Sequence, residues 1–316
     1  MMESKRDFLK KISLMTVGGL MAGSIAPVLA ATKSVPTVAG KKVIGLQIYS
    51  LGKELTENVP AGMKKIKEIG YSTIELAGYG NRKMGQYEVS EYRKIVEDAG
   101  LKITSAHVNP PERKYTSENT TKISDWWKQT AEDHVKLGVG RLIQPGMPTI
   151  ENHEDVKLVC EVFNNAGEIA KAAGMKWGYH NHNMEFKRIA KPGETLPTGP
   201  GAILRPTGDI VYDLLVDGTN PDLVFFEMDV YWTVMGQMDP LDYLEKYPKR
   251  IQVLHIKDRS VLGQSGMMNF ENIFKKAYAN GISEFYVELE KVKVNMTQFE
   301  GVKGCFDYLN TAAFVK

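Results

Sequence analysis

The chain has 316 residues, of which 43% are hydrophobic and 25% are charged, and its formal net charge is +2. This composition is typical of a globular protein, and the length fits either two domains or one large α/β barrel. Without residues 1–30, which carry four basic and two acidic side chains, the net charge would be zero, so we expect no nucleic-acid partner, because a neutral chain lacks the broad basic face that phosphate backbones need.

The N-terminus has the three parts of an export signal. Residues 4–11 are basic, residues 12–25 are apolar, and Val28-Leu29-Ala30 supplies small residues for cleavage. The stretch resembles a twin-arginine signal, with Lys5 in place of the first arginine. Its apolar part is short and glycine-rich for a membrane-spanning helix, although an uncleaved tether is the alternative. We therefore predict an exported, periplasmic protein with a signal at 1–30, a linker at 31–40 and one barrel domain at 41–316, free of the membrane once the signal is removed.

After the linker, strand-like and helix-like segments alternate to the C-terminus. The expected strands are residues 42–49, 72–76, 102–108, 141–144, 176–182, 223–231, 251–256 and 285–290. The expected helices, which have apolar residues at helical spacing, are residues 59–69, 88–99, 123–137, 156–173, 241–247, 270–279 and 296–309. Several of these helices end in a glycine that leads directly into the next strand, as helix C-caps often do.

This alternation predicts a parallel sheet with helical crossovers. We favour a closed (β/α)₈ TIM barrel over an open doubly wound sheet, because no glycine-rich nucleotide-binding motif follows the first strand. Residues 188–208 form a long connection rich in glycine and proline. We expect it to be irregular, and either a lid or binding loop, or a surface insertion. Cys160 and Cys305 have no metal-finger spacing, and we expect two buried free thiols rather than a disulfide.

Histidine and acidic residues gather at the ends of the predicted strands. Four of the six histidines lie at or near carboxyl ends, and acidic residues mark other strand ends: His107, His180, His182, His255, Glu75, Asp229 and Glu288. In a barrel the carboxyl ends of the strands converge on one mouth, so residues that are distant in sequence meet there. His134 and His153 lie in helical or loop context and are given no role.

The alternation of side chains along a strand sharpens this pattern. The pairs that share a face are His180 with His182, Glu227 with Asp229, and His255 with Lys257. A buried carboxylate without a partner is costly, and a divalent cation would supply the partner. Mixed imidazole and carboxylate ligands suit Mn²⁺, Zn²⁺, Co²⁺ or Fe²⁺ better than Ca²⁺. We predict one divalent metal, with Mn²⁺ favoured; for any one of these residues alone, a satisfied polar group is the alternative.

Five motifs carry a resemblance to a known family. They are residues 44–51 (IGLQIYSL), 178–182 (GYHNH) with Glu185-Phe186, 226–232 (FEMDVYW), 254–258 (LHIKD) and 287–289 (VEL). Together they resemble the sugar phosphate isomerase/epimerase family with its xylose isomerase-like TIM barrel, which also includes inosose dehydratases and 3-keto-glycoside lyases. The resemblance spans nearly all of the chain after the signal.

The resemblance implies a ligand set for the metal. Family members hold it with a carboxylate on strand five, an aspartate on six, a histidine on seven and a glutamate on eight. Asp229, His255 and Glu288 match the last three positions. The strand-five position carries His180 instead, which we predict as the fourth ligand, with Glu185 as the second choice.

The other candidate residues are assigned to catalysis or to the sugar. Glu288, His182 and Glu185 are the candidate acid or base groups. Gln47, Glu75, His107, Lys257 and Asp258 are predicted to bind sugar hydroxyls. Trp232, with Tyr231, is predicted to supply an apolar wall, and core packing is the alternative for these aromatic rings.

A metal bound by sugar oxygens acts as a Lewis acid and makes the proton beside a carbonyl easier to remove. Return of a proton then gives isomerisation or epimerisation, whereas expulsion of a β-substituent gives elimination. The histidine on strand five argues against an epimerase mechanism in which two carboxylates act on opposite sides of the sugar. Export argues against phosphorylated intracellular sugars as substrates. We therefore lean to a lyase or hydratase acting on a keto-sugar or keto-glycoside, for which the family implies a separate oxidoreductase.

Other function classes stay open at this stage. The alternatives are a sugar epimerase or isomerase proper, a phosphodiesterase resembling the AP endonucleases of the same superfamily, and a non-catalytic carbohydrate-binding barrel. The neutral charge and the small number of candidate ligands count against the phosphodiesterase. The expected partner is a small carbohydrate substrate, and the sequence leaves the formation of a homo-oligomer open.

Overall fold

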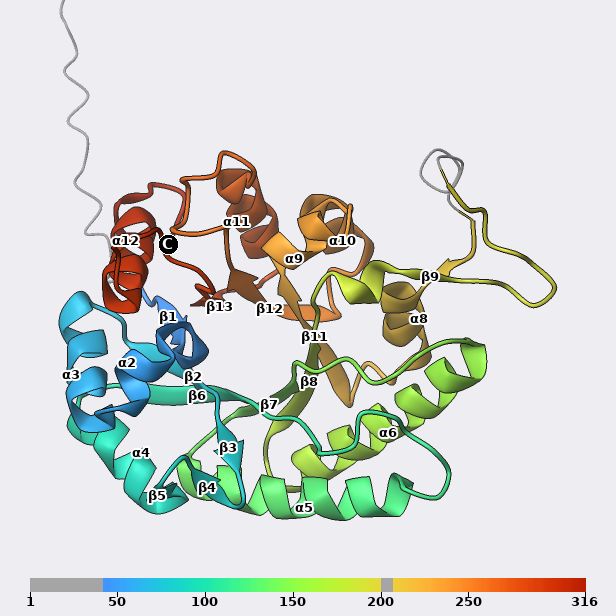
Figure 1. Ribbon diagram of the computed structural model, residues 1–316, viewed down its shortest axis with the longest axis horizontal. Helices are drawn as coiled ribbons and strands as arrows, with labels where there is room; N and C mark the ends of the chain where they lie inside the picture. Colours follow the sequence, from blue (N-terminus) through green and yellow to red (C-terminus); the bar gives the residue numbers. More distant parts are fainter. Residues whose placement is uncertain (1–41, 200–206) are drawn as a thin grey trace, which may run out of the picture. The chain divides into compact units, whose positions relative to one another are not determined.

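The computed structural model describes residues 42–199 and 207–316. In this part of the chain, eight parallel strands close into a barrel in the order β1-β13-β12-β11-β8-β7-β6-β2 (Figure 1). These strands are β1 (Gly45–Gln47), β2 (Thr73–Leu76), β6 (Lys102–His107), β7 (Arg141–Gln144), β8 (Lys176–His180), β11 (Val224–Asp229), β12 (Ile251–Ile256) and β13 (Glu284–Val287). The predicted barrel is confirmed, and the open doubly wound sheet is excluded.

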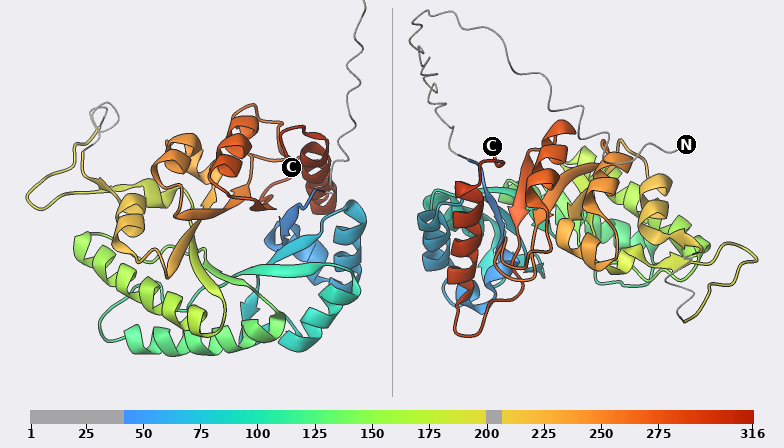
Figure 2. Two further views of the ribbon diagram at one scale, coloured as in Figure 1. Left: turned by 180° about the vertical axis from the view of Figure 1, so that it is seen from behind. Right: turned by 90° about the horizontal axis from the view of Figure 1, so that it is seen from above.

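Helices surround the barrel on the outside, as Figures 1 and 2 show. The longer ones are α3 (Val59–Ile69), α4 (Val89–Asp98), α5 (Thr120–Leu137), α6 (His153–Ala172), α11 (Phe270–Ala279) and α12 (Gln298–Thr311). Shorter ones are α2 (Lys53–Thr56), α8 (Val211–Gly218), α9 (Val230–Met235), α10 (Pro240–Lys246) and the 3₁₀ turns η1 (Ile48–Leu51) and η2 (Met184–Phe186). Local chemistry sets their ends: Asn152 and Asp155 form a capping box at the start of α6, and α5 ends at Gly138, whose φ is 78°.

The barrel interior has an apolar layer below a polar one. Ile143, Phe225, Val253 and Tyr286 form a small buried cluster, one residue from each of four barrel strands. Two residues further along β11 and β12, on the same face, come Glu227 and His255, which are fully buried. The apolar layer closes the barrel floor, so the charged side chains face the carboxyl-end mouth.

A small antiparallel sheet follows β2 and was not predicted. Its strands are β3 (Tyr79–Gly80), β4 (Lys83–Met84) and β5 (Tyr87–Glu88). Asn81 and Arg82 make the first turn with φ values of 49° and 62°, the left-handed backbone that tight hairpins require. The Arg82 guanidinium donates two hydrogen bonds of 2.8 and 2.7 Å to the Asp133 carboxylate on α5, and this ion pair fastens the hairpin to the barrel.

The long connection at residues 188–208 has no helix or strand over residues 190–199, in line with the expected irregular segment. Only its first two residues depart from that expectation, because β9 (Arg188–Ile189) pairs as a short antiparallel strand with β10 (Asp209–Ile210), which follows the connection. Residues 190–199 run outward past α8 in Figures 1 and 2, and residues 200–206 lie outside the described residues. The described part therefore fits the surface-insertion alternative better than a lid.

Three further predictions concern the cysteines, the N-terminal signal and the membrane. Cys160 and Cys305 are free and buried, as expected. The predicted signal at 1–30 and linker at 31–40 lie outside the described residues and stay predictions. None of the helices in the described part of the chain combines the length and the apolar character that a membrane crossing needs.

His134 on α5 leads to a prediction about stability and pH. Its ring is fully buried against Tyr79, and burial lowers the pKa of His134 from 6.5 to about 4. Between these two pH values the unfolded chain binds a proton that the folded chain does not, so stability is lost as the pH falls from 6.5 toward 4. The contribution of His134 to this loss is about 3 kcal/mol.

The measurement is urea unfolding of the metal-free protein at pH 7 and pH 5, for the wild type and for His134→Phe. We expect the free energy of unfolding to fall less between the two pH values in the variant, because phenylalanine cannot take up the proton. Equal losses in the two proteins would show that His134 makes no such contribution.

Candidate metal centre and active site

Four buried side chains meet at the carboxyl-end mouth of the barrel. His180 ends β8, Asp229 ends β11, His255 lies on β12, and Glu288 directly follows β13. Each offers one ligand atom, and these atoms all lie within 4.8 Å of one another. The four strands are consecutive in the barrel order, so the sheet itself brings together residues that are up to 108 positions apart in the sequence.

Strand register explains why these residues meet. His180 pairs with Glu227 across β8 and β11, and Asp229 pairs with His255 across β11 and β12. Because side chains alternate along a strand, His180, Glu227, Asp229 and His255 all face the barrel interior. The structure thus brings together the four residues that were predicted as metal ligands, and it places His180, not Glu185, among them.

Each histidine of this group also contacts a carboxylate from outside the group. His255 Nε2 lies 2.6 Å from Glu75 Oε2, and its Nδ1 lies 2.9 Å from Glu288 Oε2. His180 Nδ1 lies 3.1 Å from Glu227 Oε2. A buried carboxylate on one ring nitrogen fixes the ring and leaves the other nitrogen free to bind a metal, an arrangement that is common behind metal-binding histidines.

Below the mouth lies a hydrogen-bonded network around Glu75 and Glu227. Gln47 Nε2 and Ser105 Oγ donate to the Glu75 carboxylate at 2.8 and 2.6 Å, and His107 Nε2 lies 2.7 Å from Glu227 Oε2. His107, His180, Glu227 and His255 form a second group whose ligand atoms lie within 4.8 Å of one another. Direct contacts engage Glu227 Oε2 with one ring nitrogen of each histidine, which suits a supporting layer, whereas Glu227 Oε1 has no hydrogen-bond partner among the described residues.

The electrostatics of the upper group fit a cation. Burial raises the pKa of Asp229 to about 7, and its Oδ2 has no hydrogen-bond partner among the described residues. Burial would also raise the pKa of Glu288, but Lys257 and His255 bring it below the usual value. Lys257 Nζ lies 3.9 Å from Asp229 Oδ2, which is too far for a hydrogen bond. The donor set and the unpartnered oxygen therefore fit a bound divalent metal.

The three candidate acid or base groups have different environments. His182 lines the mouth cavity, and burial lowers its pKa to about 4. Glu288 also lines this cavity. Glu185 is fully buried and accepts hydrogen bonds from the Tyr179 hydroxyl at 2.6 Å and from the His182 backbone N–H at 2.9 Å. These contacts occupy both oxygens of Glu185, so its position fits a support for His182 rather than a direct role.

Most residues predicted to bind sugar lie behind the cavity surface. The mouth cavity measures about 350 Å³, and of those six residues only His107 lines it. Gln47 and Glu75 are fully buried in the network beneath it. The Asp258 carboxylate accepts backbone N–H groups of Arg259 and Gly263 at 2.7 and 3.0 Å. For these three the geometry indicates positioning or loop support, because their polar atoms are already engaged within the protein.

Trp232 and Lys257 contact each other beside the candidate metal site. The Lys257 ammonium lies 4.8 Å from the centre of the Trp232 ring, and the ring of His182 lies 5.8 Å from it. Trp232 is half-buried and stands next to His182, but it is not among the residues that line the mouth cavity.

Sequence reasoning missed four polar side chains that line the mouth cavity: Tyr49, Asn109, Arg113 and Glu290. Tyr49 and Glu290 lie just beyond β1 and β13, and Asn109 lies two residues past the end of β6. The sequence signal available for all three was their place directly after a barrel strand, where active-site loops begin. Arg113 lies deeper in a loop, where no pattern singled it out.

The fold and the site define the class of protein: a (β/α)₈ barrel with a histidine and carboxylate cluster at its mouth that could hold a metal ion. Residues 63–300 match the family described as xylose isomerase-like TIM barrel, and the chain belongs to that family.

Similar proteins of known name agree with this assignment. A sugar phosphate isomerase/epimerase from Parabacteroides distasonis is 53% identical, with a TM-score of 0.82, over 87% of this chain and 100% of that one. A second such protein from the same organism is 48% identical, with a TM-score of 0.84, over 89% and 100%. An inosose dehydratase of Clostridium perfringens is 32% identical over 59% of this chain and 62% of its own.

The chain thus spans less than two thirds of the length of that dehydratase. These relatives are sugar-modifying enzymes of the isomerase, epimerase and dehydratase types. The predicted resemblance to the sugar phosphate isomerase/epimerase family is confirmed.

Proposed function

We propose that the protein removes a proton from the carbon beside a carbonyl group of a keto-sugar or keto-glycoside, and that it works as a lyase or hydratase. The observation that carries this proposal is the convergence of His180, Asp229, His255 and Glu288 on one point at the barrel mouth. The similarity to inosose dehydratases supports the proposal, because a dehydratase removes water by elimination.

The proposed cofactor is one divalent metal, with Mn²⁺ favoured, held by these four residues. When bound, such an ion supplies a Lewis acid for sugar oxygens. Glu75 and Glu227 would keep the rings of His255 and His180 in place, since each contacts one ring nitrogen. The substrate would then lie in the cavity that His107, His182, Asn109 and Glu290 line.

Glu288 and His182 are the residues proposed to move protons, because both line the cavity. The lowered pKa of each leaves it unprotonated near neutral pH and able to accept a proton. In the elimination, one of them takes the proton from the carbon beside the carbonyl. The electron pair of the broken carbon–hydrogen bond then forms the new carbon–carbon double bond. The bond from the next carbon to its oxygen substituent breaks, and that oxygen leaves with a proton returned from the protein or from water.

Two alternatives remain within the same site. An epimerase or isomerase would return a proton to carbon, and a second carboxylate on the far side of the sugar would serve it best. His180 stands where the family places such a carboxylate, and burial keeps its pKa well below 6.5. A carbohydrate-binding barrel without activity would bind sugar without exchanging any proton.

The test is NMR of keto-glycosides in D₂O with Mn²⁺-loaded protein. We expect deuterium to appear at the carbon beside the carbonyl, and we expect the aglycone to be released as a free alcohol. Exchange with inversion and without release would assign the protein to the epimerases. No exchange with any keto-sugar or keto-glycoside, with or without metal, would overturn the proposed chemistry.

A further inference from the structure

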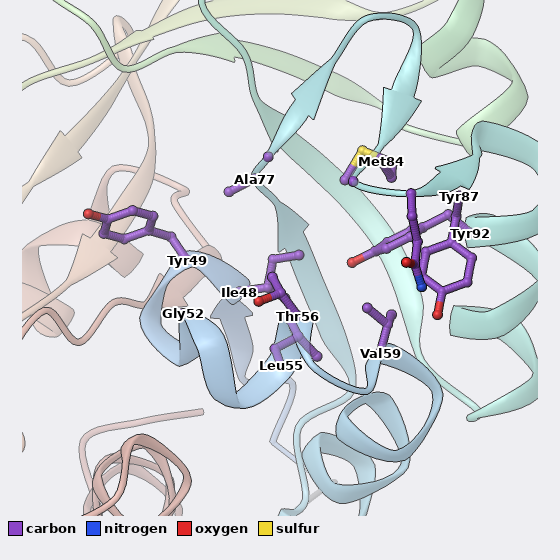
Figure 3. A pocket seen from close by; sticks show the side chains of 13 residues that line it. Ile48, Tyr49, Gly52, Leu55, Thr56, Val59, Ala77, Met84, Tyr87 and Tyr92 are labelled. Carbon is purple, nitrogen blue, oxygen red and sulfur yellow. The ribbon is translucent and has the colours of Figure 1, made fainter.

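A second cavity lies beside the barrel mouth and differs from it in character. It measures about 320 Å³, and it is lined largely by apolar and aromatic side chains (Figure 3). They come from the segment after β1 and from the small β3–β5 sheet with the adjoining α4: Ile48, Leu55, Val59, Met84, Tyr87 and Tyr92. By contrast, histidine, asparagine, arginine and glutamate side chains line the mouth cavity.

The two cavities are neighbours with a common wall. Tyr49, Ala77 and Gly78 line both of them. Figure 3 shows Tyr49 and Ala77 at one end of the apolar cavity, with Met84, Tyr87 and Tyr92 at the other. The Tyr49 side chain is 62% exposed although the residues on either side of it are buried. Tyr49 therefore stands at the boundary that a molecule occupying both cavities would cross.

The apolar cavity is held open by the fold. Met84 and Tyr92 are 2% and 4% exposed, so they belong to the core and keep the inner wall in place. The β3–β5 sheet is fixed by the buried Asp133, which binds both Arg82 and the Tyr79 hydroxyl, the latter at 2.8 Å. Small-molecule sites are commonly preformed, largely apolar cavities of this kind.

A hydrogen-bonded path joins the wall of this cavity to the candidate metal site. The backbone N–H of Tyr49 donates to Gln47 Oε1 at 2.9 Å, and Gln47 Nε2 donates to Glu75 Oε2 at 2.8 Å. The same Glu75 oxygen lies 2.6 Å from Nε2 of His255. The backbone of Tyr49 is therefore tied to the network that positions a candidate metal ligand.

We propose that this apolar cavity binds the aglycone of the substrate, as an alkyl or aryl group attached to the sugar through oxygen. The inference rests on the proposed function, because it requires the sugar itself to occupy the mouth. An apolar group gains free energy when it leaves water for such walls, whereas sugar hydroxyls would lose hydrogen bonds there. A cavity of about half this size is enough for a benzene-sized ring.

The probes separate aglycone recognition from chemical reactivity. Methyl and cyclohexylmethyl 3-keto-β-glucosides release alcohols of similar acidity, so a difference between their rates reflects binding of the aglycone. We expect the wild type to prefer the cyclohexylmethyl compound by about tenfold or more in kcat/KM. A keto-disaccharide tests a second sugar as the occupant, and we expect no such preference for it over the methyl compound.

Two variants on the same short helix locate the effect. Thr56 lines the apolar cavity, and Thr56→Trp should fill it and bring the ratio between the two glycosides close to one. Lys53 is exposed and lines neither cavity, so Lys53→Trp should keep the wild-type ratio. Tyr87→Ser, which removes part of the wall, should also lower the ratio. A ratio that stays unchanged in Thr56→Trp, including the case in which kcat/KM falls equally for both glycosides, would overturn the inference.

Binding without turnover distinguishes this inference from the proposed function. The parent cyclohexylmethyl and methyl β-glucosides have no carbonyl, so calorimetry with them reports binding alone. A preference for the cyclohexylmethyl compound that Thr56→Trp abolishes would support the cavity even if no keto-glycoside exchanged its proton. Equal affinity for the two, together with proton exchange on the keto compounds, would reject the cavity and leave the proposed function intact.

Discussion

Replacement of Asp229 by asparagine is expected to abolish metal binding and, with it, proton exchange. In the wild type, Asp229 Oδ1 accepts a hydrogen bond of 2.8 Å from the Trp232 backbone N–H. Asparagine keeps an oxygen for this bond, so the start of α9 is preserved. It loses the charge at Oδ2, the atom without a hydrogen-bond partner among the described residues. Loss of an outer-shell partner typically costs tenfold to a hundredfold in metal affinity or activity, and loss of a direct ligand should cost more.

The same variant should be stable without metal. Burial raises the pKa of Asp229 to about 7, so the charged carboxylate is unfavourable in the empty site. We therefore expect the metal-free Asp229→Asn protein to unfold at the wild-type temperature or above it. Added Mn²⁺ should raise the melting temperature of the wild type but not that of Asp229→Asn, because only a protein that binds the ion is stabilised by it.

Asp239→Asn is the matched control for this substitution. Asp239 is the N-cap of α10 and accepts the Leu241 backbone N–H at 2.8 Å, a role that asparagine fills equally well. Metal content, measured by elemental analysis, and deuterium exchange should match the wild type in this control. Full metal content in Asp229→Asn would contradict the assignment of Asp229 as a ligand.

The sequence predicted the barrel because strand-like segments alternate with helix-like segments from residue 42 to the C-terminus. It predicted the site because polar residues gather at the carboxyl ends of those strands, where pairs such as Glu227 and Asp229 on β11 share a face. Parallel strands in register then bring these positions together without any information about the loops. That is why the strand-end histidines and acidic residues could be expected at one mouth. The family resemblance then singled out Asp229, His255 and Glu288 as ligands, with His180 chosen as the fourth, and these roles stay predictions.

The features that sequence reasoning missed depend on contacts between distant segments. The β3–β5 sheet consists of strands of two residues, which are too short for a periodic pattern, and Asp133 on α5 holds its turn. Gln47 and Glu75 were predicted to bind sugar hydroxyls, but the sequence could not tell how deep these side chains lie. Both proved to lie beneath the mouth, where they bind each other, because only the closed barrel fixes how far each side chain is from solvent.

Gly45→Ala should destabilise the folded barrel strongly. Gly45 lies on β1 and is paired with β2 and with β13, the last strand of the barrel. A Cβ atom there would stand 2.5 Å from the Tyr286 ring and 2.7 Å from the backbone oxygen of Phe285. A ring can turn aside, but the Phe285 oxygen belongs to the strand that closes the barrel, so the strands would have to separate. We expect a loss of about 2–3 kcal/mol in the free energy of unfolding.

Gly140→Ala gives the matched comparison, because this glycine immediately precedes barrel strand β7. A Cβ at Gly140 would meet only the Thr104 backbone oxygen, at the ordinary contact distance of 3.5 Å. Urea unfolding followed by circular dichroism should therefore show a change within about 0.5 kcal/mol for Gly140→Ala and a clear shift of the midpoint for Gly45→Ala. If the two variants unfold alike, the contact between β1 and β13 is looser than these distances require, and the close approach at Gly45 does not limit barrel closure.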